Sequence, residues 1–235
     1  MPSLLATVRE EWPRLILELV VLVVGISASF ALEEWRGDQE NARIERRAWE
    51  GVRDELAADT LALVRQIERV ERMARADSWL LAGPPPDSID SYLDLAISYT
   101  GFTPTANAYA ELRATSAQRQ LRRRALFGAL AALQLREYER VAQWDAINRQ
   151  VVLERVVPYL DVHAPASYAA TGGGLETRGL GDTWAALKDD RVLRNLLATQ
   201  RNFRHAQAQV YGLALARARA VLADVDRALA APRAR

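Results

Sequence analysis

The strongest pattern in the chain is one apolar run near its N-terminus. Across residues 15–32, Glu18 is the only charge, and two serines are the only other polar side chains. An α-helix rises about 1.5 Å per residue and a bilayer core needs roughly 20 residues, so this run is just long enough to cross a membrane. The pattern predicts a transmembrane anchor over residues 15–35, preceded by a flank at residues 1–14.

Two tryptophans frame the run and support this interpretation. Trp12 and Trp35 lie 23 positions apart in the sequence, or about 34 Å along a helix. That spacing suits aromatic anchors at the two membrane interfaces. A cleaved signal peptide is the alternative, with a weak cleavage site around residues 28–30. Because the helical pattern continues past that site, we interpret the run as an uncleaved anchor.

Three residues inside the run are candidates for packing between spans. Glu18 allows two readings: its side chain reaches the interface and pairs with Arg14, or it marks a packed oligomer or an ion path. Gly25 and Ser29 form a small-xxx-small pair, which would let two helices approach closely. Both readings of Glu18 stay open at the level of sequence.

The basic residues around the run give opposing indications of orientation. Arg9, Arg14 and the α-amine precede it, whereas residues 33–47 carry four arginines among five acidic residues. A count of basic residues alone places the C-terminal side inside. The basic residues nearest the run, and the acidic pair Glu33 and Glu34 just after it, favour the opposite. We adopt the second orientation, with the N-terminus inside and the bulk of the chain outside.

Residues 36–82 carry a helical pattern that continues from the run, with Gly37 as a candidate bend. Gly83 and the three prolines after it predict a firm stop. Apolar residues recur at steps of mostly three and four, which predicts one long amphipathic stalk helix. The stripe consists of Ile44, Ala48, Val52, Leu56, Leu63, Ile67, Val70 and Ala74.

Residues 83–235 predict further helices, joined by loops. Asp87 or Ser88 caps a short helix that runs to about Tyr99, and Thr103 and Pro104 open the next, through residues 106–114, before Thr115 and Ser116 break the pattern. A long helix over residues 122–162 follows, with a kink expected at Pro158. Its stripe is Leu126, Leu130, Leu133, Tyr138, Val141, Trp144, Asn148, Val151 and Tyr159.

The remaining sequence predicts a loop and then the last helices. Residues 164–181, with three consecutive glycines, are expected to be a flexible loop. Asp182 is expected to cap a short helix, and residues 191–230 to form a long one with a period near 3.5. The seam proposed for this last helix is Leu193, Leu196, Gln200, Phe203, Gln207, Val210, Ala214, Val221, Val225 and Leu229.

Together these elements predict an all-α protein, in which an N-terminal transmembrane helix continues into a long stalk helix and an antiparallel helical bundle. Only one span is expected, because no later helix has an uncharged run of that length. Composition agrees with long helices, since half of the residues are hydrophobic but only 7% are aromatic. The near-heptad seams would also suit contact between copies, which predicts a homo-oligomer.

Several segments resemble a family of uncharacterised bacterial single-pass membrane proteins. The string ELVVLVVGISASFALEEW, with Glu18, Gly25 and Trp35, is similar to the start of that family. TPTANAYAELRAT at residues 103–115 and VVPYL at residues 156–160 are similar to two later segments. The chain departs from the family at residues 33–34, where two glutamates replace an asparagine pair. The resemblance implies an uncleaved anchor in a bacterial inner membrane and brings no established activity.

The search for chemistry excludes several classes of site. The chain has no cysteine, which excludes disulfides, thiolate metal sites and cysteine nucleophiles. The only histidines, His163 and His205, have no metal-ligand spacing, and no catalytic or phosphate-binding signature occurs. We expect no catalytic residue, no metal and no cofactor. A net charge of +1 gives no indication of nucleic-acid binding. The basic run Arg122, Arg123 and Arg124 is interpreted as a solvated helix face, with lipid headgroups as the alternative contact.

The sequence therefore predicts a non-enzymatic, membrane-anchored helical protein that acts by self-association or by binding a partner. Its expected partners are the lipid bilayer, further copies of itself and an unidentified membrane or envelope protein. The expected location is the inner membrane, with the bundle on the periplasmic side. The alternative is a ligand-sensing bundle that relays helix shifts to a partner protein.

Overall fold

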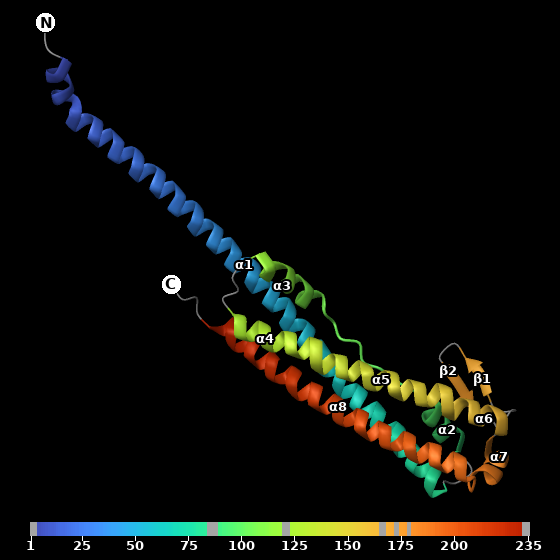
Figure 1. The fold of residues 1–235 in the computed structure, drawn as a ribbon. Helices are drawn as coiled ribbons and strands as arrows, with labels where there is room; N and C mark the ends of the chain where they lie inside the picture. Colours follow the sequence, from blue (N-terminus) through green and yellow to red (C-terminus); the bar gives the residue numbers. More distant parts are fainter. Residues whose placement is uncertain are drawn as a thin grey trace. The chain divides into compact units, whose positions relative to one another are not determined.

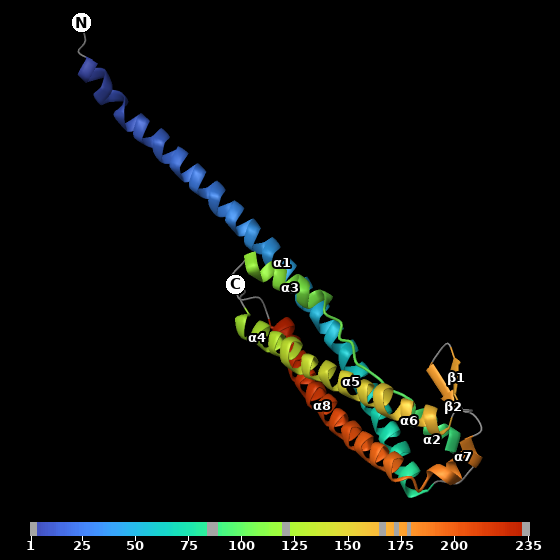
Figure 2. The same ribbon diagram turned by 45° about the vertical axis from the view of Figure 1, so that its right-hand side comes forward.

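The computed structural model of the chain describes residues 4–83, 89–118, 123–164, 168–171, 174–177 and 180–231. Side chains are described within these ranges, except at positions 4–11, 13–16, 115–118, 168–171, 174–177 and 180–183. The chain divides into two compact units, Met1–Ala48 and Trp49–Arg235. Figures 1 and 2 show the ribbon from two directions.

Helix α1, Leu4–Ala82, supplies the first unit and the beginning of the second (Figure 1). The predicted continuation of the apolar run into the amphipathic stretch is therefore confirmed as one helix. Gly37, the candidate bend, lies inside this helix, with helical residues on both sides. The helix ends at Ala82, and Gly83 follows with a φ of 84°, a backbone conformation that favours glycine. The predicted stop is confirmed at that residue, while the three prolines after it lie outside the described residues.

Within the described residues, no helix combines the length and the apolar character that are needed to cross a membrane. The predicted span begins at Leu15, and the side chains of Leu15 and Ile16 lie outside the described ones. The span therefore stays a prediction.

In the second unit, the predicted stripe of α1 faces the core. Val52, Leu56, Leu63, Val70 and Ala74 are each at most 1% exposed. The steps of four and seven between them bring these side chains to one side of a helix with 3.6 residues per turn. The amphipathic pattern thus predicted correctly which side of α1 packs against the other helices.

The predicted long helix of residues 122–162 is a succession of five helical segments. These are α4 (Arg124–Ala132), the π-helical segment η2 (Leu133–Tyr138), α5 (Glu139–Val151), the π-helical segment η3 (Val152–Val156) and α6 (Val157–His163). A π turn accommodates one more residue than an α turn. The five-residue step from Leu133 to Tyr138 in the predicted stripe falls on η2, and both residues are buried.

The second π segment lies directly before the proline at which the sequence predicts a kink. Pro158 falls in the first turn of α6. Pro158 has no N–H to donate, and the residue before it, Val157, donates its N–H to the carbonyl oxygen of Val152, five residues back. The sequence therefore located the disturbance correctly, and the structure gives it the form of a π segment.

Helix α8, Arg191–Ala230, has the predicted bounds and lies antiparallel to α5 (Figures 1 and 2). Its predicted seam is wrong at alternate positions, because Leu197, Arg204 and Tyr211 are buried where Leu196, Phe203 and Val210 were expected. From Leu193 to Ala214 the buried positions alternate in steps of four and three. At each of these three positions, an apolar residue precedes the buried one, and the predicted seam contains that neighbour instead.

Two shorter helices follow α1, and their predicted bounds need correction. Helix α2 is Ile89–Ile97, and its predicted caps, Asp87 and Ser88, lie outside the described residues. Helix α3 is Asn107–Gln118, so Thr103 and Pro104 do not open it, and Thr115 and Ser116 do not end it. Residues 98–106, between the two helices, are non-helical because side chains of other helices bind their backbone, as described below.

The expected loop of residues 164–181 contains a small hairpin instead. Strands β1 (Tyr168–Thr171) and β2 (Gly174–Thr177) pair antiparallel, with Tyr168 opposite Thr177. The sequence signal for it is two four-residue runs separated by two glycines, which is a hairpin spacing. Helix α7, Leu180–Leu187, begins before Asp182, so that residue is not its cap.

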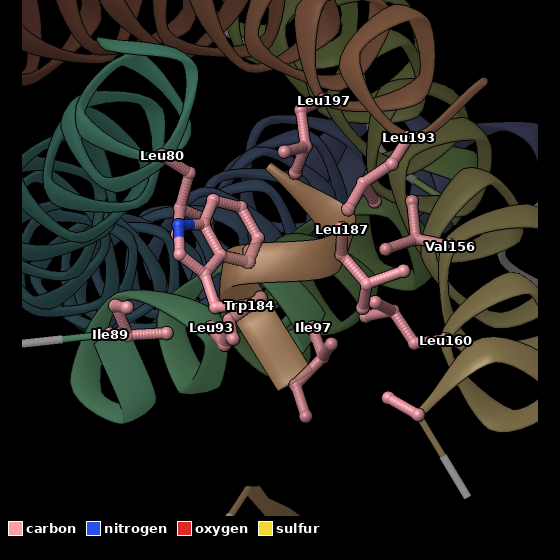
Figure 3. Close-up of a cluster of buried hydrophobic side chains, with 12 residues drawn as sticks. Leu80, Ile89, Leu93, Ile97, Val156, Leu160, Trp184, Leu187, Leu193 and Leu197 are labelled. Carbon is pink, nitrogen blue, oxygen red and sulfur yellow. The ribbon is translucent and has the colours of Figure 1, made fainter. Parts of the chain in front are cut away.

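A cluster of buried apolar side chains joins α7 to the end of the bundle (Figure 3). Trp184 of α7 is 4% exposed and lies among leucines and isoleucines from α1, α2 and α8. Burying one large aromatic side chain contributes on the order of 2–3 kcal/mol. The cluster consists of Leu80, Ile89, Leu93, Ala96, Ile97, Val156, Leu160, Ala164, Trp184, Leu187, Leu193 and Leu197.

Candidate functional site

Two features of the described chain lie beyond ordinary core packing: an exposed apolar segment in the first unit and a buried polar network in the second. The apolar segment comprises residues 17–32 of α1. Its large apolar side chains are between 47% and 67% exposed, and the consecutive residues 19–24 are all exposed. A helix that is apolar on every side is normally buried in a large core or in a membrane. This apolar surface therefore requires a cover, meaning a contact with lipid or with another protein that excludes water.

The interfacial and packing candidates lie along the same helix. Trp12 and Trp35 are each 59% exposed. Ser29 Oγ donates to the carbonyl oxygen of Gly25 at 2.9 Å, so the hydroxyl is satisfied within its own helix. A Cβ atom added at Gly25 would meet nothing within 4 Å. Glu18 is exposed as well. The Gly25 and Ser29 face is thus unoccupied among the described residues.

The second feature surrounds the connector, defined as residues 98–106 between α2 and α3. At its first end Arg204 of α8, which is 0% exposed, reaches the last carbonyl groups of α2. Arg204 donates to the carbonyl oxygens of Leu95, Ala96 and Ser98 at 3.1, 2.8 and 2.8 Å. The C-terminus of a helix carries a partial negative charge and carbonyls without partners, and a guanidinium group satisfies both.

The same guanidinium group is paired with a buried carboxylate. Arg204 Nη1 donates to both oxygens of Asp77 at 2.9 Å and to the carbonyl oxygen of Met73 at 3.0 Å. Both side chains of the pair are 0% exposed. Burial raises the pKa of Asp77 to about 7, and the charge of Arg204 opposes that rise. Burial also lowers the pKa of Arg204, against the pull of Asp77.

The middle of the connector is held by a carboxylate of α5. Asp145 accepts from the backbone N–H of Phe102 at 2.8 Å, from Gln207 Nε2 at 2.7 Å and from the Tyr211 hydroxyl at 2.5 Å. Burial raises the pKa of Asp145, and these three donors oppose the rise. A Cβ atom at Gly101 would lie 3.3 Å from an Asp145 oxygen, so the close approach favours glycine there.

The far end of the connector is held by carboxylates of α1. Asp59 accepts from the N–H of Thr105 at 3.1 Å, and Glu55 accepts from the N–H of Ala108 in the first turn of α3 at 2.9 Å. Negative groups are favourable at a helix N-terminus. Burial raises the pKa of Asp59 as well. The connector is thus bound by a cation where α2 ends and by anions where α3 begins.

The histidine and the arginines that the sequence singled out make contacts within the protein or are exposed. His163 is exposed, its ring stacks on Tyr159 at 4.1 Å, and its Nδ1 lies 2.8 Å from the Tyr159 carbonyl oxygen. No group of three or more His, Asp or Glu side chains in the described part of the chain could hold a metal ion. Arg123 donates to the Ala228 carbonyl oxygen at 2.6 Å, near the end of α8. Arg122 lies outside the described residues, and Arg124 is exposed.

Sequence reasoning identified the apolar segment but missed the polar network. Gln200 and Gln207 lie in the predicted seam without a predicted partner, and Arg204 lies outside that seam. The three-four alternation predicted from Leu193 places Phe203 in the seam, whereas the buried positions follow a four-three alternation that includes Gln200, Arg204 and Gln207. Their partners could not be found this way, because Asp77, Asp145 and the connector are distant in sequence.

No family model matches the chain, and no curated protein or solved structure matches it either.

Proposed function

We propose that this protein is a membrane-anchored, non-enzymatic helical protein that works by associating with itself or with a partner in a bacterial envelope. The observation that carries the proposal is the exposure of the apolar side chains of residues 17–32 on every side of α1. Contiguous exposed apolar surface of this kind is rare on soluble monomers and marks a membrane or protein contact.

A bilayer is the cover that best fits the segment. The sequence offers 18 residues with a single charge near one end, and the tryptophans at both ends have exposed rings suited to the interfaces. In this arrangement Glu18 lies within two turns of one interface, where its carboxylate can reach water or lipid headgroups. The orientation that we propose keeps the N-terminus inside and the bundle on the periplasmic side.

The buried network supports a binding role more than an enzymatic one. Its carboxylates and its arginine are engaged with backbone groups and with one another, and they fix the connector to α1, α5 and α8. Side chains that are held by such contacts serve to keep the helices in position. The signalling alternative is favoured by η2 and η3, because π segments are positions at which a helix can change register.

The anchor is tested by placing charge in the middle of the apolar segment. We expect the variant Leu22→Arg with Ile26→Arg to lose retention in membranes after alkaline extraction, because each central arginine costs about 2.5–3.5 kcal/mol of insertion free energy. The matched control is Leu61→Arg with Leu213→Arg, at leucines that are 61% and 59% exposed in the second unit. Equal retention of both double variants would contradict the anchor.

Self-association is tested by the mass of the protein in detergent, measured by light scattering. We expect a mass of more than one copy, and a lower mass for Gly25→Leu than for the neighbouring control Val23→Leu. An added side chain at Gly25 meets nothing in its own chain, so that loss would report contact with another copy. Glu18→Gln decides between the two readings of Glu18. The substitution would change the mass only if the carboxylate lies in a contact between two copies of the chain. A strict monomer would contradict self-association.

A further inference from the structure

The centre of the polar network contains buried polar atoms without a hydrogen-bond partner among the described residues. They are both amide atoms of Asn148, Nε of Arg204, and Oε1 of Gln200 and of Gln207. All four side chains are 0% exposed. Buried polar groups in folded proteins are almost always paired, with protein atoms or with ordered water. Their concentration on α5 and α8 therefore requires an explanation.

The register of the two antiparallel helical runs brings Asn148 to the level of Arg204, one turn from Gln207. Arg123 contacts Ala228 near one end, and Asp145 contacts Gln207 farther along. As residue numbers rise on the α4–α5 run, they fall at nearly the same rate on α8. Asn148 lies three residues after Asp145, which places it opposite Arg204, three residues before Gln207. One turn of a helix separates these levels, so Asn148 and Asp145 share the side of α5 that faces α8.

The chemistry of this level is that of a hydration site. It offers donors from Arg204 Nε and Asn148 Nδ2, and acceptors from Asn148 Oδ1 and Gln207 Oε1. A water molecule donates twice and accepts twice, and buried water typically makes about three hydrogen bonds to protein atoms that otherwise lack partners. We propose that ordered water binds between α5 and α8 at this level and bridges Asn148 to Arg204 and Gln207.

The charges around the site favour water over an ion. A cation would lie beside the guanidinium group of Arg204, and an anion would lie near the carboxylates of Asp77 and Asp145. Arg204 and Asp77 already balance each other in charge. The remaining groups, Asn148 and Gln207, are neutral amides, which bind water without a change in charge.

The water completes one continuous set of hydrogen bonds across the bundle. On one side Arg204 holds the end of α2, and on the other Asp145 holds the middle of the connector through Phe102. Asn148 has no direct hydrogen bond to either set among the described residues. Bridging water joins the two sets, so the same site links the contacts at the first end of the connector to those at its middle.

The test is a crystal structure of the full chain at a resolution that shows ordered water, with Asn148→Leu as the matched control. We expect density at about 2.7–3.2 Å from Asn148 and from Arg204 Nε, and its loss in the variant while the three bonds of Asp145 remain. Direct bonding of Asn148 to Gln207 or Arg204, with no density between them, would overturn the proposal.

A second measurement keeps the proposal testable if the variant does not fold. In the native full chain, with the side-chain amides labelled with nitrogen-15, the Asn148 amide protons should show magnetisation transfer from long-lived water. Transfer only from neighbouring side-chain protons would contradict the hydration site.

Discussion

At the scale of single residues, Arg204 has the largest set of buried interactions in the polar network. It binds one carboxylate of α1 and four backbone carbonyl groups, of which one lies in α1, two in α2 and one in the connector. A buried ion pair alone is weak support for a fold, because desolvation of both charges opposes their attraction. The carbonyl groups of Leu95 and Ser98 change that balance, since Arg204 supplies their side-chain donor near the end of α2.

We expect Arg204→Met to lower the free energy of unfolding by about 3–5 kcal/mol, because it leaves Asp77 buried without a countercharge. The double variant with Asp77→Leu should recover only part of that loss, since the carbonyl groups of Leu95 and Ser98 still lack the donor that Arg204 supplies. Urea unfolding followed by circular dichroism measures both. Arg217→Met, at an exposed position of the same helix, is the control and should change stability by less than about 0.5 kcal/mol. Full recovery in the double variant would contradict the role of the carbonyl contacts.

Burial also gives the protein a dependence on pH with a definite sign. It raises the pKa of Asp59 and Asp145, and that of Asp77 to about 7. A carboxyl group with a higher pKa in the folded chain binds its proton more tightly when folded. Its contribution to stability is complete below the unfolded pKa of about 4 and is lost as the pH rises through the folded pKa.

We therefore expect these three groups to lower the free energy of unfolding as the pH rises from about 4 to about 7. Urea unfolding at a series of pH values measures the slope. Asp145→Asn keeps the shape of the side chain and removes its titration, so the slope should become smaller. A slope that is unchanged in this variant would show that Asp145 does not titrate in that range.

Individual residues were the part of the protein least accessible from sequence. Periodicity could place Arg204 in a seam, because the seam is a local property of α8. It could not pair Arg204 with Asp77, which is 127 positions away, or assign Asp145 to the connector. Those pairings depend on how distant helices pack, which the periodicity of a single helix does not indicate.

At the scale of elements, the long periodic helices were predictable and the short segments were not. Helices α1 and α8 repeat their pattern over many turns, so the period is well determined. The start of α3 was mistaken, because Thr103 and Pro104 form a standard opening that tertiary contacts override. Asp59 and Asp145 bind the backbone of residues 98–106 and keep that segment out of a helix.

The π segment η2 gives a prediction at this scale. Removal of Leu135, which is 63% exposed, should convert η2 to α-helix and leave the faces of α4 and α5 in register. Removal of Gln143, an exposed residue within α5, should instead rotate Asp145 and Asn148 by about 100° away from α8. We expect the second deletion to cost more than about 3 kcal/mol of stability and the first to retain cooperative unfolding. Thermal unfolding measures both, and equal losses would contradict the interpretation of η2 as a one-residue insertion.

At the scale of the whole molecule, the two units have different relations to water. The second unit buries its apolar stripes and binds its buried charged side chains through hydrogen bonds, as an independent core does. In the first unit, the apolar side chains of residues 17–32 are exposed. A sequence read alone already distinguishes these two parts, because an all-apolar run and an amphipathic stripe are different patterns. We propose that the bilayer supplies the cover for the first unit.

The most direct test of this proposal is whether the two ends of the apolar segment lie on opposite sides of a membrane. Because the chain has no cysteine, two variants with one cysteine each, Ser3→Cys and Gln143→Cys, can be labelled with a maleimide that does not cross membranes. We expect the cysteine at position 143 to react from the periplasmic side of intact cells, and the one at position 3 to react only after the inner membrane is opened. Reaction of both cysteines from the same side would contradict a membrane-spanning anchor.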